Sequence, residues 1–226
     1  MGLPLKILDL AVHAAGRSLL KVPTLDVPAG ALIGVRGPSG AGKSTFLHAL
    51  SGLTEVEGSI RWGKTDIARL SPERRSAFRA AYFGMIFQDH LLFDELSTEA
   101  NASLAALFSP AAKRRDIARR AADRLDRLRV PPGRRSVASF SGGERQRVAI
   151  SRALATDPAI LLADEPTASL DRPAADRLID DLVALVRQSG KTLIAVSHDP
   201  HLLERLDRVL TIEDGALRAD SLAETT

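Results

Sequence analysis

The chain has 226 residues, of which 45% are hydrophobic and 26% are charged, a composition typical of a globular protein with a sizeable core. Its 31 basic and 28 acidic residues leave a formal net charge of only +3, so no nucleic acid partner is expected. The chain has no cysteine for disulfides or thiolate chemistry, no apolar run of the roughly 20 residues of a membrane helix, and early charges that argue against a signal peptide, so we expect a cytosolic protein.

Two strands of a small sheet are predicted at the start of the chain. Apolar residues recur through residues 5–12 and 19–27, and Gly16 marks a turn between them. A third segment, residues 31–35, is apolar and reads as a buried strand.

A glycine-rich loop follows this buried strand and opens a predicted helix. It matches G-x-x-x-x-G-K-[ST] without a mismatch and comprises Gly37, Pro38, Ser39, Gly40, Ala41, Gly42, Lys43, Ser44 and Thr45. The unpaired N–H groups and the dipole of a helix N-terminus both favour an anion. Lys43 can reach the β- and γ-phosphates of a nucleoside triphosphate, and the Ser44 hydroxyl can ligate its Mg²⁺. We therefore predict a phosphate-binding loop rather than a glycine-rich turn with a chance lysine.

The predicted loop lacks an obvious aromatic neighbour, because residues 1–45 contain no Phe, Tyr or Trp. Stacking of a base on an aromatic side chain contributes about 1–3 kcal/mol on protein surfaces where it has been studied. In this region only His13 could take that place, and a solvent-facing histidine at a turn or strand end is at least as good an interpretation.

A second central strand is predicted at residues 84–87, and Gln88 stands at its end. Open α/β sheets place ligand-binding groups at such strand ends. The Gln88 amide could sense Mg²⁺ and the γ-phosphate, although a glutamine that simply ends a strand is the alternative.

Residues 90–157 give no strand signal. Ile117, Ala121, Leu125 and Leu128 fall at helical spacing among many arginines, and aspartates are interleaved with these arginines. We interpret this surface as a solvated helix face rather than a nucleic-acid site.

A second glycine-rich turn, Ser141-Gly142-Gly143, precedes another predicted helix. Its bare N–H groups form a second anion-binding helix start. One nucleotide does not need both helix starts from a single subunit.

An apolar strand at residues 159–163 ends in two carboxylates, Asp164 and Glu165, which is the Walker B pattern. Since side chains alternate along a strand, the two carboxylates start on opposite faces and can have different roles. Asp164 suits Mg²⁺ coordination, and Glu165 could polarise a water molecule for attack on the γ-phosphate. A solvated strand end is the alternative interpretation.

The remaining segments complete an alternating pattern of strands and helices. A helix is predicted to begin near Pro173, and a buried strand at residues 191–196 leads to His198. His198 could donate to a phosphate oxygen or orient a water molecule, or it could be a plain loop residue. Residues 214–215 give a hairpin signal, and the polar tail after Asp220 is expected to fray.

Six motifs occur once each and in order: the phosphate-binding loop, the strand-end Gln88, Ser-Gly-Gly-Glu, Asp-Glu, Ser-Leu-Asp and Ser-His. Together they resemble the ATP-binding subunit of an ABC transporter, over essentially the whole chain. The resemblance implies an α/β fold with a RecA-like P-loop NTPase core at residues 1–88 and 158–226, including an N-terminal antiparallel β region. An inserted α-helical subdomain with the signature motif would occupy residues 89–157, within a single cassette of residues 1–226.

The same resemblance implies an ATPase that uses ATP and Mg²⁺ and works as a head-to-tail pair of copies. ATP would lie between the phosphate-binding loop of one copy and Ser141, Gly142 and Gly143 of the other, which would explain the two anion-binding helix starts. Asp171 would couple the two copies.

Catalytic roles also follow from the resemblance. Glu165 would be the general base, His198 would contact the γ-phosphate, and Lys43 would neutralise phosphate charge. Gln88 would join Ser44 and Asp164 at the metal and would act as the lever to a membrane-spanning permease subunit.

Residues 83–88 and 141–147 are most similar to the branch of the family that serves lipoprotein release, macrolide export and cell division. Phe140 departs from the usual Leu, and Glu144 stands where Gln is commonest. The resemblance implies a peripheral location on the cytoplasmic side of the inner membrane, and residues 89–93 are our predicted docking surface for the permease.

Two other classes of function fit parts of the pattern. A soluble ABC-type ATPase acting on ribosomes or DNA generally has two cassettes or a long coiled-coil insertion, whereas this chain has one phosphate-binding loop and no sustained heptads. A small-molecule kinase with the same loop would leave Ser141-Gly142-Gly143 without a role.

Overall fold

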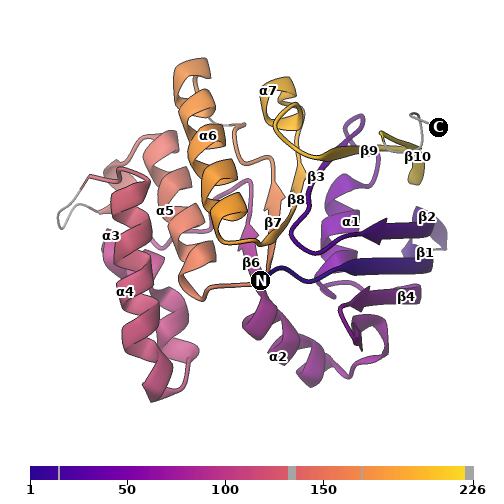
Figure 1. Cartoon of the computed structure of the whole chain (residues 1–226), viewed down its shortest axis with the longest axis horizontal. Coiled ribbons are helices and arrows are strands. Elements are labelled where there is room, and N and C mark those ends of the chain that lie inside the picture. Colours follow the sequence, from indigo (N-terminus) through magenta and orange to yellow (C-terminus); the bar gives the residue numbers. More distant parts are fainter. Residues whose placement is uncertain (15, 132–135, 169, 222–226) are drawn as a thin grey trace.

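The computed structural model describes residues 1–14, 16–131, 136–168 and 170–221. Within these residues ten strands form one sheet in the order β5-β4-β1-β2-β10-β9-β3-β8-β7-β6 (Figure 1). The strands are β1 (Leu5–Ala14), β2 (Arg17–Val27), β3 (Leu32–Arg36), β4 (Glu57–Trp62), β5 (Thr65–Asp66), β6 (Phe83–Ile86), β7 (Ile160–Asp164), β8 (Thr192–Val196), β9 (Arg208–Glu213) and β10 (Ala216–Asp220). The α-helices are α1 (Lys43–Leu50), α2 (Pro72–Tyr82), α3 (Thr98–Ala102), α4 (Ala111–Arg127), α5 (Gly142–Ala155), α6 (Arg172–Gln188) and α7 (Pro200–Leu203).

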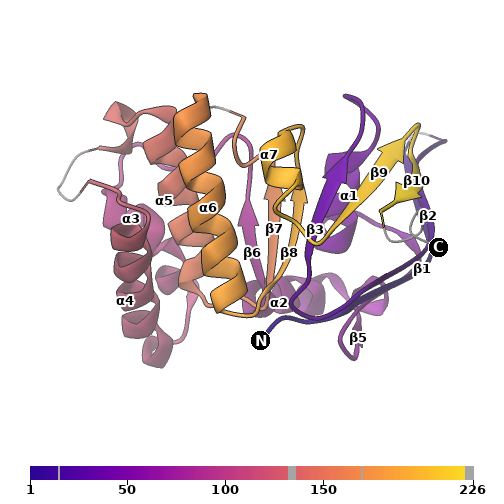
Figure 2. The ribbon, with the colours of Figure 1, turned by 45° about the horizontal axis from the view of Figure 1, so that its top comes forward.

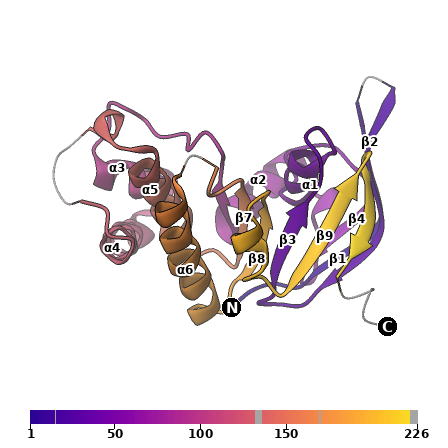
Figure 3. The ribbon, with the colours of Figure 1, turned by 90° about the horizontal axis from the view of Figure 1, so that it is seen from above.

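One half of the sheet, from β6 at its edge to β9, is parallel, with the strands in the order β6, β7, β8, β3 and β9. Successive residues of these strands enter two different hydrophobic clusters, because side chains alternate between the faces of a sheet. Leu162 and Ile194 pack in the cluster that contains α1, whereas Leu161 and Leu193 pack in the cluster that contains α6. Figure 3 shows α1 and α6 on opposite sides of these strands. Since both faces are covered, β3, β6, β7 and β8 are mostly apolar, as the RecA-like class requires.

Strands β5, β4, β1 and β2 are antiparallel, as the resemblance implied, but the prediction of a small separate sheet was wrong, because β2 pairs with β10 and so continues the one ten-stranded sheet. β1 pairs with both β2 and β4, and the buried side chains of all three strands join the cluster of α1. Trp62 at the end of β4 donates a hydrogen bond from Nε1 to the carbonyl oxygen of Leu50 at 2.9 Å, which anchors α1 to these strands. β9 and β10 form the predicted hairpin, and Asp214 and Gly215 both have the positive φ (47° and 70°) that a tight hairpin turn needs.

The helices α3, α4 and α5 lie between β6 and β7 in the chain and gather at the end of the molecule beyond α6 (Figure 2). The predicted apolar stripe of α4 is confirmed, because Ile117, Ala121, Leu125 and Leu128 are all buried. Their cluster continues through α5 and α6 to β7 and β8. The boundaries of a separate helical subdomain at residues 89–157 therefore stay a prediction.

No helix within the described ranges combines the length and the apolar character needed to cross a membrane. Two earlier expectations fall on residues that the structure does not describe: the fraying of the tail concerns residues 222–226, and the Ser-Leu-Asp motif begins at Ser169.

Candidate active site

The glycine-rich loop forms a cradle at the start of α1. Gly37, Gly40 and Gly42 have φ values of 153°, 77° and 103°, a backbone that only glycine adopts easily. Gly42 is the N-cap of α1, and no side chain caps the first turn, so its amides are available to an anion. The Lys43 ammonium donates to the carbonyl oxygens of Gly37 and Pro38, both at 2.8 Å, which holds the lysine across the loop.

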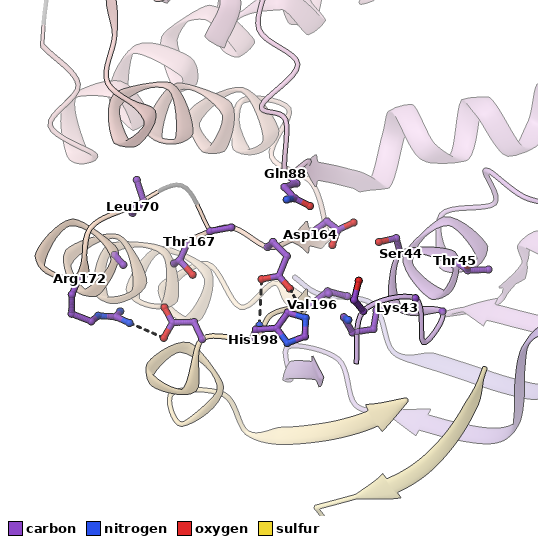
Figure 4. A pocket seen from close by; sticks show the side chains of 17 residues that line it. Lys43, Ser44, Thr45, Gln88, Asp164, Thr167, Leu170, Arg172, Val196 and His198 are labelled. Carbon is purple, nitrogen blue, oxygen red and sulfur yellow. Dashed lines mark hydrogen bonds and ion pairs between the residues drawn. The ribbon is translucent and has the colours of Figure 1, made fainter. Parts of the chain in front are cut away.

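A pocket of about 610 Å³ opens beside this loop, at the carboxyl ends of β6, β7 and β8 (Figure 4). Predicted residues from distant parts of the chain come together there: Ser39, Gly40, Gly42, Lys43, Ser44, Thr45, Gln88, Asp164, Glu165 and His198. Topology explains the convergence, because parallel strands bring their carboxyl ends to one edge of the sheet.

The two carboxylates of the Walker B strand both line the pocket, although neighbouring strand residues normally face opposite sides. β7 ends at Asp164, and Glu165 adopts a left-handed conformation with φ 47°. The Glu165 N–H donates to the carbonyl oxygen of Val196 at 2.9 Å, which ties this turn to the end of β8. The turn therefore redirects Glu165 into the same cavity as Asp164, at the cost of a strained backbone.

Glu165 and His198 are partners in the pocket. The His198 N–H donates to Glu165 Oε2 at 3.3 Å, and His198 Nε2 lies 3.5 Å from Glu165 Oε1. Burial raises the pKa of Glu165, and the neighbouring Asp164 adds to this, whereas His198 and Lys43 act in the opposite direction. A carboxylate with a raised pKa is a better proton acceptor, so the arrangement suits a general base.

Three oxygen donors face one space in the pocket. Figure 4 shows the side chains of Ser44, Gln88 and Asp164 directed toward one another from α1, the end of β6 and the end of β7. Hydroxyl, amide and carboxylate oxygens are ligands that Mg²⁺ accepts, and this ion usually takes its other ligands from water and substrate phosphates. The donor set therefore fits a magnesium ion bound with a triphosphate.

Comparison with known proteins identifies the family. A family described as ABC transporter matches residues 20–168. The chain belongs to the ABC transporter family. The lipoprotein-releasing system ATP-binding protein LolD of Paramagnetospirillum magneticum is 39% identical over 206 residues, which cover 88% of each protein. LolD of Nitratidesulfovibrio vulgaris is 40% identical over 203 residues, which cover 88% of this chain and 86% of that protein.

Solved structures of ABC cassettes have the same fold. The dimeric bacterial ABC transporter cassette MJ0796 superposes with a TM-score of 0.85 at 28% identity, covering 96% of this chain and 97% of that one. The cassette cbiO1 of Clostridium perfringens, part of the ABC transporter complex cbiONQ, gives 0.84 at 26% identity, covering 98% and 91%. The chain is thus an ATP-binding subunit of an ABC transporter and an ATPase. The family and its relatives favour this function over that of a soluble ATPase acting on ribosomes or DNA.

The signature turn of this ABC subunit lies outside its own pocket. Among the described residues that line the pocket, Ser141, Gly142, Gly143 and Asp171 are absent. Ser141 instead caps α5 in a reciprocal capping box with Glu144, and Asp171 caps α6 by accepting from the Ala174 N–H at 2.8 Å. A Cβ on Gly143 would lie 3.1 Å from the side chain of Leu170, which does line the pocket, so the turn borders the rim of the site.

Sequence reasoning missed a pair of charged residues at this rim. Arg172 and Asp199 both line the pocket, and their Nη1 and Oδ1 atoms lie 2.9 Å apart. Burial alone would raise the pKa of Asp199, but hydrogen bonds from Arg172 and Thr167 hold it below its ordinary value. The available signal was position, because each residue directly follows a predicted one, Asp171 or His198.

His13 does not line the pocket beside the phosphate-binding loop, nor a second, smaller pocket next to it. His13 Nε2 lies 3.7 Å from Glu57 Oε2 on the surface. The smaller pocket, of about 240 Å³, adjoins the first at Ser39 and Gly40 and is lined by Leu19, Pro38, Ala41 and Asp214, among others. Within the described residues, no Phe, Tyr or Trp side chain lines either pocket.

Proposed function

We propose that this chain binds Mg²⁺–ATP in the pocket beside α1 and hydrolyses it as a dimer of two copies, on the cytoplasmic side of a membrane, to drive a separate membrane-spanning subunit. The main observation behind this proposal is that the two anion-binding helix starts of one copy lie in different places. The phosphate-binding loop and the carboxylates share one pocket, whereas the helix start at Ser141-Gly142-Gly143 stands outside it.

Each pocket residue has a role that its geometry supports. Lys43 and the open amides of α1 would hold the β- and γ-phosphates, and Ser44, Gln88 and Asp164 would hold Mg²⁺. When bound, the ion neutralises phosphate charge. Glu165 would accept the proton of the attacking water, and His198, which donates its N–H to Glu165, would keep that carboxylate in place beside the γ-phosphate.

A second copy would complete the site. MJ0796, whose fold this chain shares, is dimeric and has been seen bound to ADP and Pi after hydrolysis. In the corresponding arrangement, the amides after Ser141 of one copy would reach the γ-phosphate held by the other. Helix α5 supports such a role because the capping box already forms its N-terminus and Ser141, its N-cap, is exposed.

Replacing Ser141 with arginine (Ser141→Arg) should reduce ATP hydrolysis about 100-fold, because the long side chain blocks a donor group that acts in the transition state. Nucleotide binding by the isolated copy should change less than about twofold, since Ser141 does not line its own pocket. Phosphate release and titration with a fluorescent ATP analogue measure the two effects. Ser141→Ala is the control, because it removes the helix cap, a loss of about 1 kcal/mol, without filling the interface. Full activity in Ser141→Arg would exclude this surface from the site.

The membrane partner would dock on residues 89–93. Leu91 and Phe93 are 54% and 50% exposed, so two large apolar side chains face solvent soon after the pocket residue Gln88. The relatives named as lipoprotein-releasing system ATP-binding proteins support lipoprotein release as the driven process.

We expect Phe93→Ser to lower co-purification with the membrane subunit at least about tenfold while basal hydrolysis persists, because Phe93 does not line the pocket. The exposed Leu53 offers a control, Leu53→Ser, on another surface. Retention of the complex by Phe93→Ser would place docking elsewhere.

A further inference from the structure

The segment that follows Gln88 has an unusual backbone. His90 and Leu91 have φ values of 60° and 50°, so two consecutive residues other than glycine are left-handed. The Leu91 N–H donates to the carbonyl oxygen of Asp89 at 2.6 Å, and that of His90 donates to Phe87 at 3.1 Å, which makes the turn tight. Such a pair is costly for residues with a Cβ and persists only where the surroundings impose it.

One side chain binds both left-handed residues. Arg152 of α5 donates from Nη2 to the carbonyl oxygen of His90 at 2.6 Å and from Nη1 to that of Leu91 at 2.5 Å. The guanidinium thus binds both left-handed residues through two hydrogen bonds, one from each terminal nitrogen. Burial lowers the pKa of Arg152, and no described carboxylate lies within ion-pair distance of it. Arg152 is half-buried, and the acceptors of its guanidinium are two main-chain oxygens of the turn, so it is positioned to shape this turn.

The His90–Leu91 turn connects the pocket residue Gln88 with helix α5. Gln88, two residues earlier, lines the pocket with Ser44 and Asp164. On the other side, α5 begins at the Ser141 cap, and its Arg145, two helical turns before Arg152, reaches the same segment with Nη1 3.3 Å from Asp94 Oδ1. The helix that starts at the signature turn therefore holds the segment that places Gln88.

We propose that Arg152 is a positioning residue for ATP hydrolysis, which holds the His90–Leu91 turn in its left-handed form and thereby fixes Gln88 in the pocket and joins it to α5. This inference rests on the proposed role of Gln88 at the metal. Arg152 itself touches neither the phosphate-binding loop nor the carboxylates. Its loss should therefore affect turnover and leave nucleotide binding largely unchanged.

The test is steady-state hydrolysis and nucleotide titration on the purified full-length chain. Arg152→Ala should lower kcat at least about tenfold, because small displacements of positioned groups can cost this much or more. The Kd for a fluorescent ATP analogue should change less than about twofold. Arg120→Ala is the matched control: its Nε donates at 2.8 Å to the carbonyl oxygen of Ala155, the last residue of α5, and does not contact the His90–Leu91 turn, so its kcat should stay within about twofold.

A double-mutant cycle separates this inference from the proposed function. If Arg152 acts through Gln88, then Gln88→Ala and Gln88→Ala/Arg152→Ala should have equal kcat. Effects that multiply in the double variant would overturn the inference and leave the role of Gln88 intact. Normal turnover in Gln88→Ala alone would instead refute the proposed role of Gln88, and with it the route by which Arg152 acts.

Two more variants distinguish positioning from general stability. Asparagine tolerates the left-handed region better than leucine, so Leu91→Asn should restore part of the kcat that Arg152→Ala loses. Lack of rescue, together with a kcat that falls only as the melting temperature falls, would show that Arg152 is merely structural. If Arg152→Ala does not fold, Arg152→Lys takes its place. Lysine keeps the charge but cannot form both hydrogen bonds to the turn, so the same loss of kcat is expected.

Discussion

Replacing Glu165 with glutamine (Glu165→Gln) should reduce ATP hydrolysis by about 10²–10⁴-fold, the usual contribution of a general base. Glutamine keeps the shape of the side chain but accepts no proton at neutral pH. Nucleotide binding should persist, because the phosphate-binding loop and Lys43 are unchanged. The variant should therefore accumulate with ATP as a stable dimer. Phosphate release measures the first effect and size-exclusion chromatography the second.

The inactivity of this variant should not arise from unfolding. Because burial raises the pKa of Glu165, its contribution to stability is present below the unfolded-state pKa and is lost as the pH rises through the folded-state pKa. Removing the carboxylate should thus leave the melting temperature at neutral pH equal or higher. The same raised pKa means that wild-type kcat should fall on acidification at a higher pH than an ordinary glutamate would cause. Glu57→Gln on the surface is the control, and hydrolysis at the wild-type rate by Glu165→Gln would remove Glu165 from the base role.

Replacing Gly37 with alanine (Gly37→Ala) should abolish high-affinity nucleotide binding and destabilise the fold by about 2–6 kcal/mol, from overpacking and backbone strain together. A Cβ at this position would lie 1.9 Å from the carbonyl oxygen of Ile212, a main-chain atom of β9 that cannot move aside alone. The φ of 153° is also unfavourable for alanine. The carbonyl oxygen of Gly37 accepts from Lys43, so the displacement would disturb the lysine as well. Denaturant unfolding and nucleotide titration measure the two effects.

Gly40→Ala separates steric overlap from strain in the same loop. Gly40 also has a positive φ, 77°, but a Cβ there would have no neighbour within 4 Å. The substitution should therefore cost only about 1–2 kcal/mol, the usual penalty of a left-handed residue with a Cβ. Equal losses in the two variants would mean that the contact with Ile212 does not matter.

Local sequence patterns were enough to predict the main strands and helices and most residues of the nucleotide pocket. The phosphate-binding loop, the apolar strands that lead to Gln88, Asp164 and His198, and the stripe of α4 are each recorded in contiguous residues, because phosphate binding and strand burial impose local rules. The rule that ligands bind at the carboxyl ends of parallel strands then allowed these residues to be grouped before any coordinates.

Other features depend on contacts between segments far apart in the chain. Whether Glu165 shares a cavity with Asp164 was decided by its left-handed turn against Val196, where the alternation of a strand had predicted opposite faces. The grip of Arg152 on the turn at His90 joins residues 62 apart, and no local spacing rule predicts such a pair. The sequence by itself determined the fold class, the family and the chemical groups of the site. Only the tertiary structure decided how these groups are oriented, because a side chain's direction depends on the backbone turn and the partner that the folded chain supplies.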